Sequence, residues 1–245
     1  MGQNKDHEQL AALDEFIECG PIQEVIGVVK SGKEATVYAC RHDDGYLIAA
    51  KVYRDRDVRR FANDAAYMEG RTRGMRRRDA LAVATKSRAG REISFGHWVS
   101  QEWETLRILH AAGCAVPEPI KLSARVILME YIGDEDGPAP TLSTAHPDPG
   151  EARRLFETLM HNVERMLACD RVHGDLSPYN VLYHGGEVRI IDLPQAVDAR
   201  FNSNALDLLD RDVENLCRHF ARFGVQSDAW RLSRTMWARY LRSDL

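Results

Sequence analysis

One short stretch of the chain constrains its fold and chemistry more than any other. Residues 172–182 read VHGDLSPYNVL, so that His173, Asp175 and Asn180 follow the spacing His-x-Asp-x4-Asn. This spacing is typical of loops that transfer phosphoryl groups. In such loops a carboxylate accepts a hydrogen bond from the attacking hydroxyl, and an amide oxygen further along ligates a divalent cation. We predict a catalytic role for Asp175 and a metal-binding role for Asn180. A polar turn before a hairpin is the alternative.

A second carboxylate follows this loop. The β-rich runs 181–183 and 188–191 are separated by His-Gly-Gly-Glu, which predicts a hairpin with Asp192 at the end of its second strand. Kinases place a metal-binding aspartate there, and Asp192 is our second predicted metal ligand. Its alternative is a turn former. Leu193 and Pro194 follow in place of Phe-Gly, and proline restricts both positions, which argues against switching by a phenylalanine flip.

A glycine-containing turn lies upstream, in the stretch GVVKSGKEATVY of residues 27–38. Such a turn between strands can bring backbone N–H groups near phosphates, and we assign nucleotide binding to Ser31, Gly32 and Lys33. The stretch nearly matches a Walker A loop, but Glu34 replaces the required Ser or Thr and strand character follows. We reject the Walker A interpretation, and an ordinary hairpin turn stays open as the alternative.

The strand sequence IAAKV resembles the kinase strand Val-Ala-Ile-Lys, whose lysine binds the α- and β-phosphates. Most strand lysines only point to solvent. In the helix predicted for residues 97–112, however, Glu102 shares a face with the apolar residues Val99, Leu106 and Leu109. A carboxylate on an apolar face needs a partner, because burying it unpaired costs several kcal/mol. We therefore predict an ion pair between Lys51 and Glu102, and place both residues at the nucleotide.

The remaining pattern predicts an α+β chain of two lobes. Residues 1–24 are predicted to be a helical extension, with Leu10, Leu13 and Ile17 at helical spacing. Residues 25–132 are predicted to be a lobe with an antiparallel sheet. Within it, residues 54–96 are rich in arginine and predicted to be a flexible loop. Residues 133–245 are predicted to be a mainly helical lobe. This is the outline of a bilobal, minimal protein-kinase-like fold.

Composition narrows the range of partners. The 245 residues are 44% hydrophobic and carry a formal net charge of only −4. This net charge does not indicate nucleic acid or an anionic membrane surface as an obligatory partner. The five cysteines lie far apart, without metal-ligand spacing, and are interpreted as reduced thiols. No apolar stretch approaches the roughly 18 residues of a membrane span. We expect a cytoplasmic protein without a membrane partner.

Taken in order, these motifs resemble the RIO family of atypical serine/threonine protein kinases, in its branch with the Ser-Gly-Lys-Glu-Ala loop. We expect a stand-alone, bacterial member of it. The resemblance rests on landmarks spread over roughly residues 25–220, which are Ser31 to Ala35, Lys51, Glu102, Met129 to Gly133, His173 to Ser177, Asn180, Ile191, Asp192, Arg211 and Asp212.

The resemblance implies a fold, cofactors and further roles. ATP with Mg²⁺ or Mn²⁺ would bind between the lobes, with adenine on the backbone of Glu130 and Ile132. Asp192 would accept the phosphoryl group as an aspartyl-phosphate, which implies autophosphorylation, ATPase activity or both. Asp212 would brace the catalytic loop, although it could be a simple surface acid.

Substrates and partners stay open at this point. A protein substrate is implied but not identified, and the protein itself is one candidate. The arginines of residues 54–96 invite a role with ribosomal RNA or a ribosomal particle, although a solvated charge run explains them as well. Two other functions compete. One is a small-molecule kinase of the aminoglycoside or choline type, and the other is a nucleotide-gated ribosome assembly factor.

Overall fold

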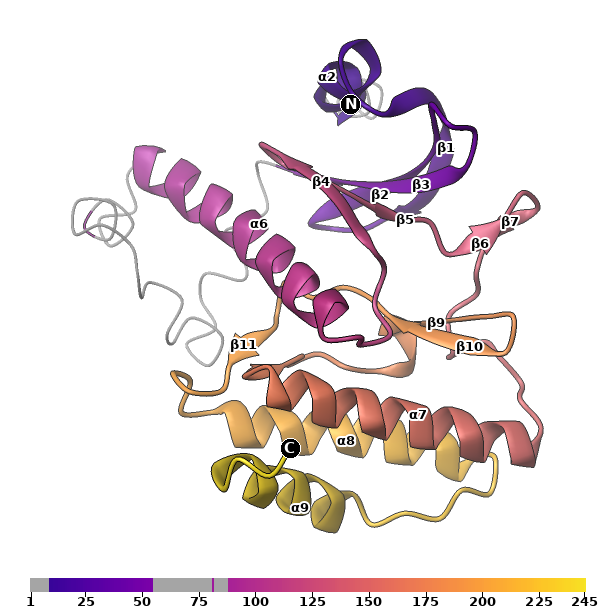
Figure 1. Ribbon diagram of the computed structural model, residues 1–245, viewed down its shortest axis with the longest axis vertical. Coiled ribbons are helices and arrows are strands. Elements are labelled where there is room, and N and C mark those ends of the chain that lie inside the picture. The colour runs from indigo at the N-terminus through magenta and orange to yellow at the C-terminus, as the bar shows by residue number, and fades with distance from the viewer. Residues whose placement is uncertain (1–8, 55–80, 82–87) are drawn as a thin grey trace. The chain divides into compact units, whose positions relative to one another are not determined.

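A computed structural model describes residues 9–54, 81 and 88–245 of the chain (Figure 1). The described residues divide into two compact units. The N-terminal unit comprises 9–54, 81, 88–104 and 118–138, and the C-terminal unit comprises 105–117 and 139–245. The division after Pro138 leaves residues 133–138 with the sheet, whereas the sequence suggested a boundary near Ile132. The predicted arginine-rich loop lies largely outside the described residues.

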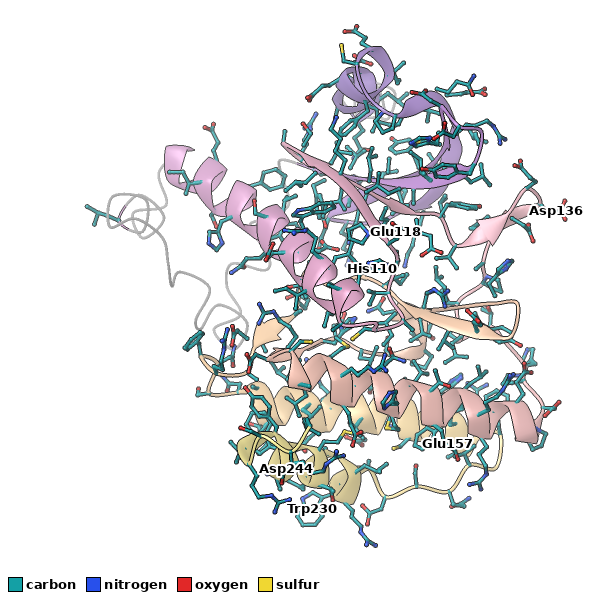
Figure 2. All side chains as sticks on the ribbon, in the orientation of Figure 1. His110, Glu118, Asp136, Glu157, Trp230 and Asp244 are labelled. Atoms are coloured by element: carbon teal, nitrogen blue, oxygen red, sulfur yellow. The ribbon has the colours of Figure 1, made fainter. Side chains whose placement is uncertain are left out.

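The N-terminal unit is built on a five-stranded sheet in the order β1-β2-β3-β5-β4. All neighbouring strands are antiparallel, which confirms the predicted sheet, and β4 is a strand that the sequence analysis did not identify. The strands are β1 (Ile22–Ser31), β2 (Ala35–His42), β3 (Leu47–Tyr53), β4 (Pro119–Ser123) and β5 (Val126–Glu130). A small hairpin, β6 (Gly133–Asp134) and β7 (Gly137–Pro138), follows β5, with Asp136 at its tip (Figure 2).

Side chains alternate between the two faces of β3, as the strand period requires. Ile48, Ala50 and Val52 pack into a buried cluster with Leu13 and Phe16 of the N-terminal segment. Lys51 belongs to the alternate set. One face of the sheet is therefore covered by the N-terminal segment, and Lys51 projects from the other.

The N-terminal segment is helical, as predicted, although it is not one continuous α-helix. It consists of the 3-10 turn η1 (Ala11–Leu13) and the short helix α2 (Asp14–Glu18). Leu13 and Phe16 are buried, whereas Leu10 and Ile17 are 40% and 44% exposed. Of the three apolar residues at helical spacing, only Leu13 is therefore buried, and part of the segment is a 3-10 turn, which advances the chain by a different angle per residue than an α-helix does.

Helix α6 (Arg88–Ala111) begins earlier than the predicted start at His97, so residues 88–96 are helical and not part of a loop. The predicted face is otherwise correct. Val99, Leu106 and Leu109 are buried, and Glu102 lies among them. Glu104 is exposed. The division into units runs through this helix, between Glu104 and Thr105.

The C-terminal unit is mainly helical, as predicted. Its helices α7 (Pro149–Ala168), α8 (Ala205–Ala221) and α9 (Ala229–Leu241) pack against one another (Figure 1). The Asp148 side chain caps α7 by accepting from the Glu151 N–H at 2.9 Å. Pro149 occupies the first turn, where a backbone N–H would have no acceptor within the helix, so the missing N–H of proline costs nothing. Trp230, at the start of α9, points away from the helices toward solvent (Figure 2).

In this unit, short strands flank the loops that contain the predicted site residues Asp175, Asn180 and Asp192. The predicted hairpin is present as β9 (Val181–His184) and β10 (Glu187–Ile190), joined by Gly185 and Gly186, whose positive φ angles of 58° and 80° suit a tight turn. A second two-stranded ribbon pairs β8 (Arg171–Val172) with β11 (Val197–Asp198). Residues 173–177 follow β8, the 3-10 turn η2 (Pro178–Asn180) precedes β9, and Asp192 lies between β10 and β11.

Two features concern the whole described part of the chain. All five cysteines lie within it and are free thiols. None of its helices combines the length and the apolar run that crossing a bilayer requires.

Candidate active site

Asp175 and Asn180 are brought together within the C-terminal unit. Asn180 Nδ2 donates to the backbone oxygen of Asp175 at 2.9 Å and lies 3.4 Å from its carboxylate Oδ2. Because both contacts use the amide nitrogen, the Asn180 amide oxygen is the atom that faces away from Asp175. The pair thus presents a carboxylate and an amide oxygen from one loop.

His173 ties this loop to the segment that carries Asp192. Its Nε2 lies 3.1 Å from the Ile191 carbonyl oxygen, and its Nδ1 accepts from the Asp175 N–H at 3.3 Å. These partners fit a neutral imidazole with the proton on Nε2. Burial lowers the pKa of His173 and so favours the same neutral form. A third link runs from the Ile191 N–H to the Asn180 carbonyl oxygen at 2.9 Å.

Helix α8 holds the backbone of the same loop from beneath. Asp212, only 1% exposed, accepts from the N–H groups of Gly174 and Leu176, both at 2.8 Å. Arg211 donates to the Gly174 carbonyl oxygen at 2.5 Å, and Asn215 donates to that of Leu176 at 3.0 Å. The bracing role expected for Asp212 is confirmed by these contacts.

Burial raises the pKa of the Asp212 carboxyl to about 7, and the two backbone N–H donors and the nearby Arg211 only partly offset this rise. The two hydrogen bonds to the backbone N–H groups of Gly174 and Leu176 are the contacts through which Asp212 holds the loop.

Asp192 occupies an unusual backbone conformation for a residue with a side chain. Its φ angle is 67°, in the left-handed region, where aspartate is tolerated better than most residues but still at an energetic cost. It lies two residues beyond the end of β10, so the strand does not hold it directly as predicted. The carboxylate is close enough to Asp175 and His173 to influence their titration.

The charge balance at Asp175 follows from these neighbours. Partial desolvation raises the pKa of its carboxyl, and the like charge of Asp192 raises it further. Arg211 and the Asn180 hydrogen bond oppose the rise. Asp175 is nevertheless exposed to solvent, which its predicted role at a substrate hydroxyl requires.

The oxygen donors around Asp192 fit a hard divalent cation. Mg²⁺ takes oxygen ligands and is commonly held by one or two protein groups together with substrate phosphates. The Asn180 amide oxygen and the Asp192 carboxylate are the predicted pair of such ligands, and the nearby like charges of Asp175 and Asp192 would be stabilised by a cation. Among the described residues, no three or more His, Cys, Asp or Glu side chains gather in one metal-binding group. The Asn180–Asp192 pair contains only one such residue.

In the N-terminal unit, Lys51 and Glu102 form the predicted ion pair. Lys51 Nζ lies 2.7 Å from Glu102 Oε1, and the two residues are 8% and 5% exposed. The ammonium group also lies 5.3 Å from the centre of the Tyr53 ring, which adds a cation–π contact. Because both groups are buried, the stability of this ion pair depends on the close approach of the two charges, since a lone buried charge is strongly unfavourable.

The predicted phosphate loop is a hairpin turn between β1 and β2. The Gly32 N–H donates to the Ala35 carbonyl oxygen at 2.9 Å. Ser31 and Lys33 flank this glycine and are exposed. A Cβ added at Gly32 would lie 3.3 Å from the Ala35 oxygen, so a larger residue would crowd the turn.

The residues expected to bind adenine lie where β5 ends. The Glu130 N–H donates to the Glu118 carbonyl oxygen at 2.8 Å, and Glu130 Oε2 accepts from the Glu118 N–H at 3.1 Å. Ile132 follows before β6. These bonds fix the strand end, and the binding role of Glu130 and Ile132 stays a prediction.

Several residues that contact the predicted site residues within each unit were not assigned a role from the sequence. His173 was quoted as part of a motif without a role, and Asn215 and Arg54 were not singled out. Asn215 could have been found from its position three residues after Asp212, on the same face of an amphipathic helix. Arg54, whose side chain donates to the hydroxyls of Ser31 and Thr36, offered no such signal, because these contacts depend on how the strands pair.

The fold and these motifs together define the class of this protein as protein-kinase-like. It has an antiparallel sheet carrying a buried Lys–Glu pair and a helical unit with a His-x-Asp-x4-Asn loop followed by an aspartate. A family model described as "RIO domain" matches residues 36–232. The chain therefore belongs to the RIO domain family.

Named relatives agree with this assignment. The chain is 33% identical over 218 residues to serine/threonine-protein kinase rio1 of Schizosaccharomyces pombe, covering 87% of this chain and 41% of that protein. It is 31% identical over 223 residues to the RIO-type serine/threonine-protein kinase Rio1 of Haloferax volcanii, covering 91% of this chain and 72% of that protein. The chain thus spans less than half of the fission yeast relative.

A solved structure supports the fold. The Rio2 kinase from Chaetomium thermophilum, in a complex with ADP, Mg²⁺ and phosphoaspartate, matches 99% of this chain and 71% of its own with a TM-score of 0.62. The sequence identity is 19%, so this likeness concerns the fold.

Proposed function

We propose that this chain is an ATP-dependent phosphotransferase, acting as a serine/threonine kinase of the RIO type. The observation that carries the proposal is the Asp175–Asn180 pair, joined by a hydrogen bond of 2.9 Å on a loop that Asp212 clamps through two backbone N–H groups. The names of the relatives, serine/threonine-protein kinases, support the same reaction class.

Each residue has one task in this proposal. Lys51, oriented by Glu102, contacts the α- and β-phosphates of ATP, and the turn at Gly32 approaches them through its backbone. Asn180 and Asp192 would hold Mg²⁺ or Mn²⁺, which neutralises charge on the phosphate oxygens when bound. Asp175 accepts a hydrogen bond from the acceptor hydroxyl, orients it, and takes up its proton as the new phosphate ester forms.

Asp192 has a second candidate task as the phosphoryl acceptor. A carboxylate oxygen of Asp192 would form a bond to the γ-phosphorus while the bond to the β,γ-bridging oxygen breaks and ADP leaves. Water would then hydrolyse the acyl phosphate and return the free carboxylate. The phosphoaspartate in the Rio2 structure of similar fold supports this route. Asp192 is also partly exposed to solvent, and its backbone has a strained, left-handed conformation, both of which suit a reactive residue.

The acceptor and partners belong to the same proposal. The acceptor hydroxyl is that of a serine or threonine, on this protein or on another. A ribosomal particle or RNA is the partner class that the arginine-rich residues 54–96 would suit by charge. Most of those residues lie outside the described part of the chain.

The test is the intact mass of the protein after incubation with MgATP, together with the ATP consumed. We expect a mass gain of one phosphoryl group in the wild type and its loss in Asp175→Ala. Asp207→Asn is the matched control, since Asp207 is an exposed acid on α8. No mass gain and no ATP consumption by the wild type would contradict the proposal.

Hydroxylamine separates the two acceptor routes, because it cleaves acyl phosphates and leaves phosphoserine intact. A labile phosphate that is absent from Asp192→Asn supports the aspartyl-phosphate. A stable phosphate located on a serine or threonine supports direct transfer to a hydroxyl.

A further inference from the structure

A chain of side-chain hydrogen bonds runs through the N-terminal unit and ends on the phosphate loop. Gln9 Oε1 accepts from the Thr36 hydroxyl at 2.8 Å and from the Tyr38 hydroxyl at 3.3 Å. Arg54 Nη2 donates to Thr36 Oγ1 at 2.9 Å and to Ser31 Oγ at 2.7 Å. The order is therefore Gln9, Thr36, Arg54, Ser31.

The four members come from separate parts of the sequence. Gln9 precedes η1, Thr36 lies on β2, Arg54 directly follows β3, and Ser31 ends β1 at the phosphate loop. Gln9 and Thr36 are buried, so their polar groups depend on one another for hydrogen bonds. Ser31 is exposed, so its hydroxyl would be free to rotate without the guanidinium.

The backbone of Arg54 adds to this arrangement. Its N–H donates to the Glu34 carbonyl oxygen at 2.8 Å, within the stretch that follows Lys33. Arg54 therefore contacts both sides of the turn, at Ser31 through its side chain and at Glu34 through its backbone. A single guanidinium nitrogen, Nη2, therefore links the Ser31 end of β1 to Thr36 on β2, in addition to the backbone hydrogen bonds of the turn.

We propose that Arg54 is a positioning residue that holds the Ser31–Lys33 turn in its nucleotide-binding form, and that Gln9 orients the guanidinium of Arg54 through the hydroxyl of Thr36. Gln9, which precedes η1 and α2 in the chain, thereby connects the region that covers the sheet to the phosphate loop. The inference rests on the proposed function, since it assumes that this turn contacts the phosphates of ATP.

The test compares three variants that remove successive members of the chain. Arg54→Met removes the central donor, Thr36→Val removes a hydroxyl with little change of shape, and Gln9→Leu removes the first acceptor. Arg231→Met, at an exposed arginine of α9, is the matched control. The readouts are MgATP affinity by titration and amide hydrogen exchange of residues 31–35 in the absence of nucleotide.

We expect Arg54→Met to weaken MgATP binding about 3- to 10-fold, the range that loss of one net hydrogen bond produces. Exchange at residues 31–35 should accelerate in Arg54→Met and Thr36→Val, by less in Gln9→Leu, and not in the control. Arg54→Lys should recover part of both effects, because it restores a cationic donor. Adding Ser31→Ala to Arg54→Met should cost less than the two separate effects combined.

The two readouts separate failure of this inference from failure of the proposed function. Wild-type exchange at residues 31–35 in both Arg54→Met and Thr36→Val would overturn the inference, whatever the nucleotide affinity. If the wild type does not bind MgATP, the proposed function is wrong, and the exchange measurement still decides whether Arg54 orders the turn. If Arg54→Met fails to fold, Thr36→Val and Ser31→Ala carry the same test.

Discussion

The two loops proposed to handle phosphate are held by different means. The loop of residues 173–177 is fixed by side chains that are themselves buried, with Asp212 accepting two backbone N–H groups and His173 bridging to Ile191. The turn of residues 31–33 closes the β1–β2 ladder at the Ser31–Thr36 pair, with a backbone hydrogen bond from Gly32 to Ala35. The side chain that supports it, Arg54, reaches it through the exposed hydroxyl of Ser31.

This difference indicates which parts are preorganised. In the proposed function, Asp175 needs a fixed position relative to Asn180, because proton transfer and orientation depend on short distances. A phosphate loop must admit and release the nucleotide, so a lighter support suits it. We therefore expect substitutions beneath the catalytic loop to cost more than substitutions beneath the phosphate loop.

The largest effect should come from Asp175→Asn. The amide keeps the shape and can still accept from Asn180, but it cannot take up a proton. Single-turnover phosphoryl transfer should slow by about 10²- to 10⁴-fold, the usual contribution of a general base. MgATP affinity and the thermal midpoint should stay close to those of the wild type. A slowing of less than about tenfold would mean that Asp175 is not the base, on the same scale.

Next in size is the buried pair Lys51–Glu102. Either Lys51→Met or Glu102→Leu alone should destabilise the fold by about 3–5 kcal/mol, because each leaves a buried charge without its partner. The double variant should recover most of that stability while phosphoryl transfer remains lost. Urea unfolding measures the first effect and single-turnover transfer the second.

A double variant as unstable as the sum of its singles would contradict this account of the pair. Restored phosphoryl transfer in the double variant would show that Lys51 is not needed to bind the phosphates of ATP.

The pH dependence of stability should reveal Asp212. Its pKa is about 7 in the folded state and about 3.9 when unfolded, so the folded state retains a proton that the unfolded state has lost between these values. Its contribution to the free energy of unfolding therefore falls as pH rises from about 4 to 7, by up to about 4 kcal/mol, and is constant above.

The difference in unfolding free energy between wild type and Asp212→Asn isolates this contribution, because asparagine does not titrate. That difference should decline across the same pH window. A difference that is flat, or that rises with pH, would show that the carboxylate is ionised in the folded protein and that charge is what braces the loop.

The smallest expected effect concerns the acid limb of the rate profile. Desolvation and the charge of Asp192 raise the pKa of Asp175 above 3.9, the ordinary value of an aspartate carboxyl. The phosphoryl-transfer rate should therefore begin to fall, as pH is lowered, at a pH above 3.9, because the protonated carboxyl cannot act as a base. Arg211 lowers this pKa, so Arg211→Met should move the limb to higher pH. A shift to lower pH would contradict the assigned electrostatics, and Arg218→Met on the exposed face of α8 is the control.

Much of this arrangement could be predicted from the sequence because it is local. The spacing of Asp175 and Asn180 falls within one loop, and the turn of Gly185 and Gly186 predicts its own hairpin. The pairing of Lys51 with Glu102 was also within reach, since a carboxylate on an apolar helix face requires a cation.

The parts that could not be predicted depend on long-range pairing or on small changes of helical phase. Arg54 meets Ser31 and Thr36 only because β1, β2 and β3 are neighbours in register. Residues 11–13 form a 3-10 turn, and Phe16 of the following helix is buried whereas Ile17 is exposed; the apolar spacing of the sequence indicates neither. The left-handed backbone of Asp192 likewise has no sequence signal of its own.

Amide hydrogen exchange, measured with and without MgATP, tests the contrast between the two loops most directly. The N–H groups of Gly174 and Leu176 should be strongly protected in the free protein and change by less than about twofold on binding, because Asp212 already fixes them. Residues 31–35 should exchange faster in the free protein and slow markedly with nucleotide. Unprotected amides at Gly174 and Leu176 that become protected only with MgATP would contradict the claim that the catalytic loop is preorganised.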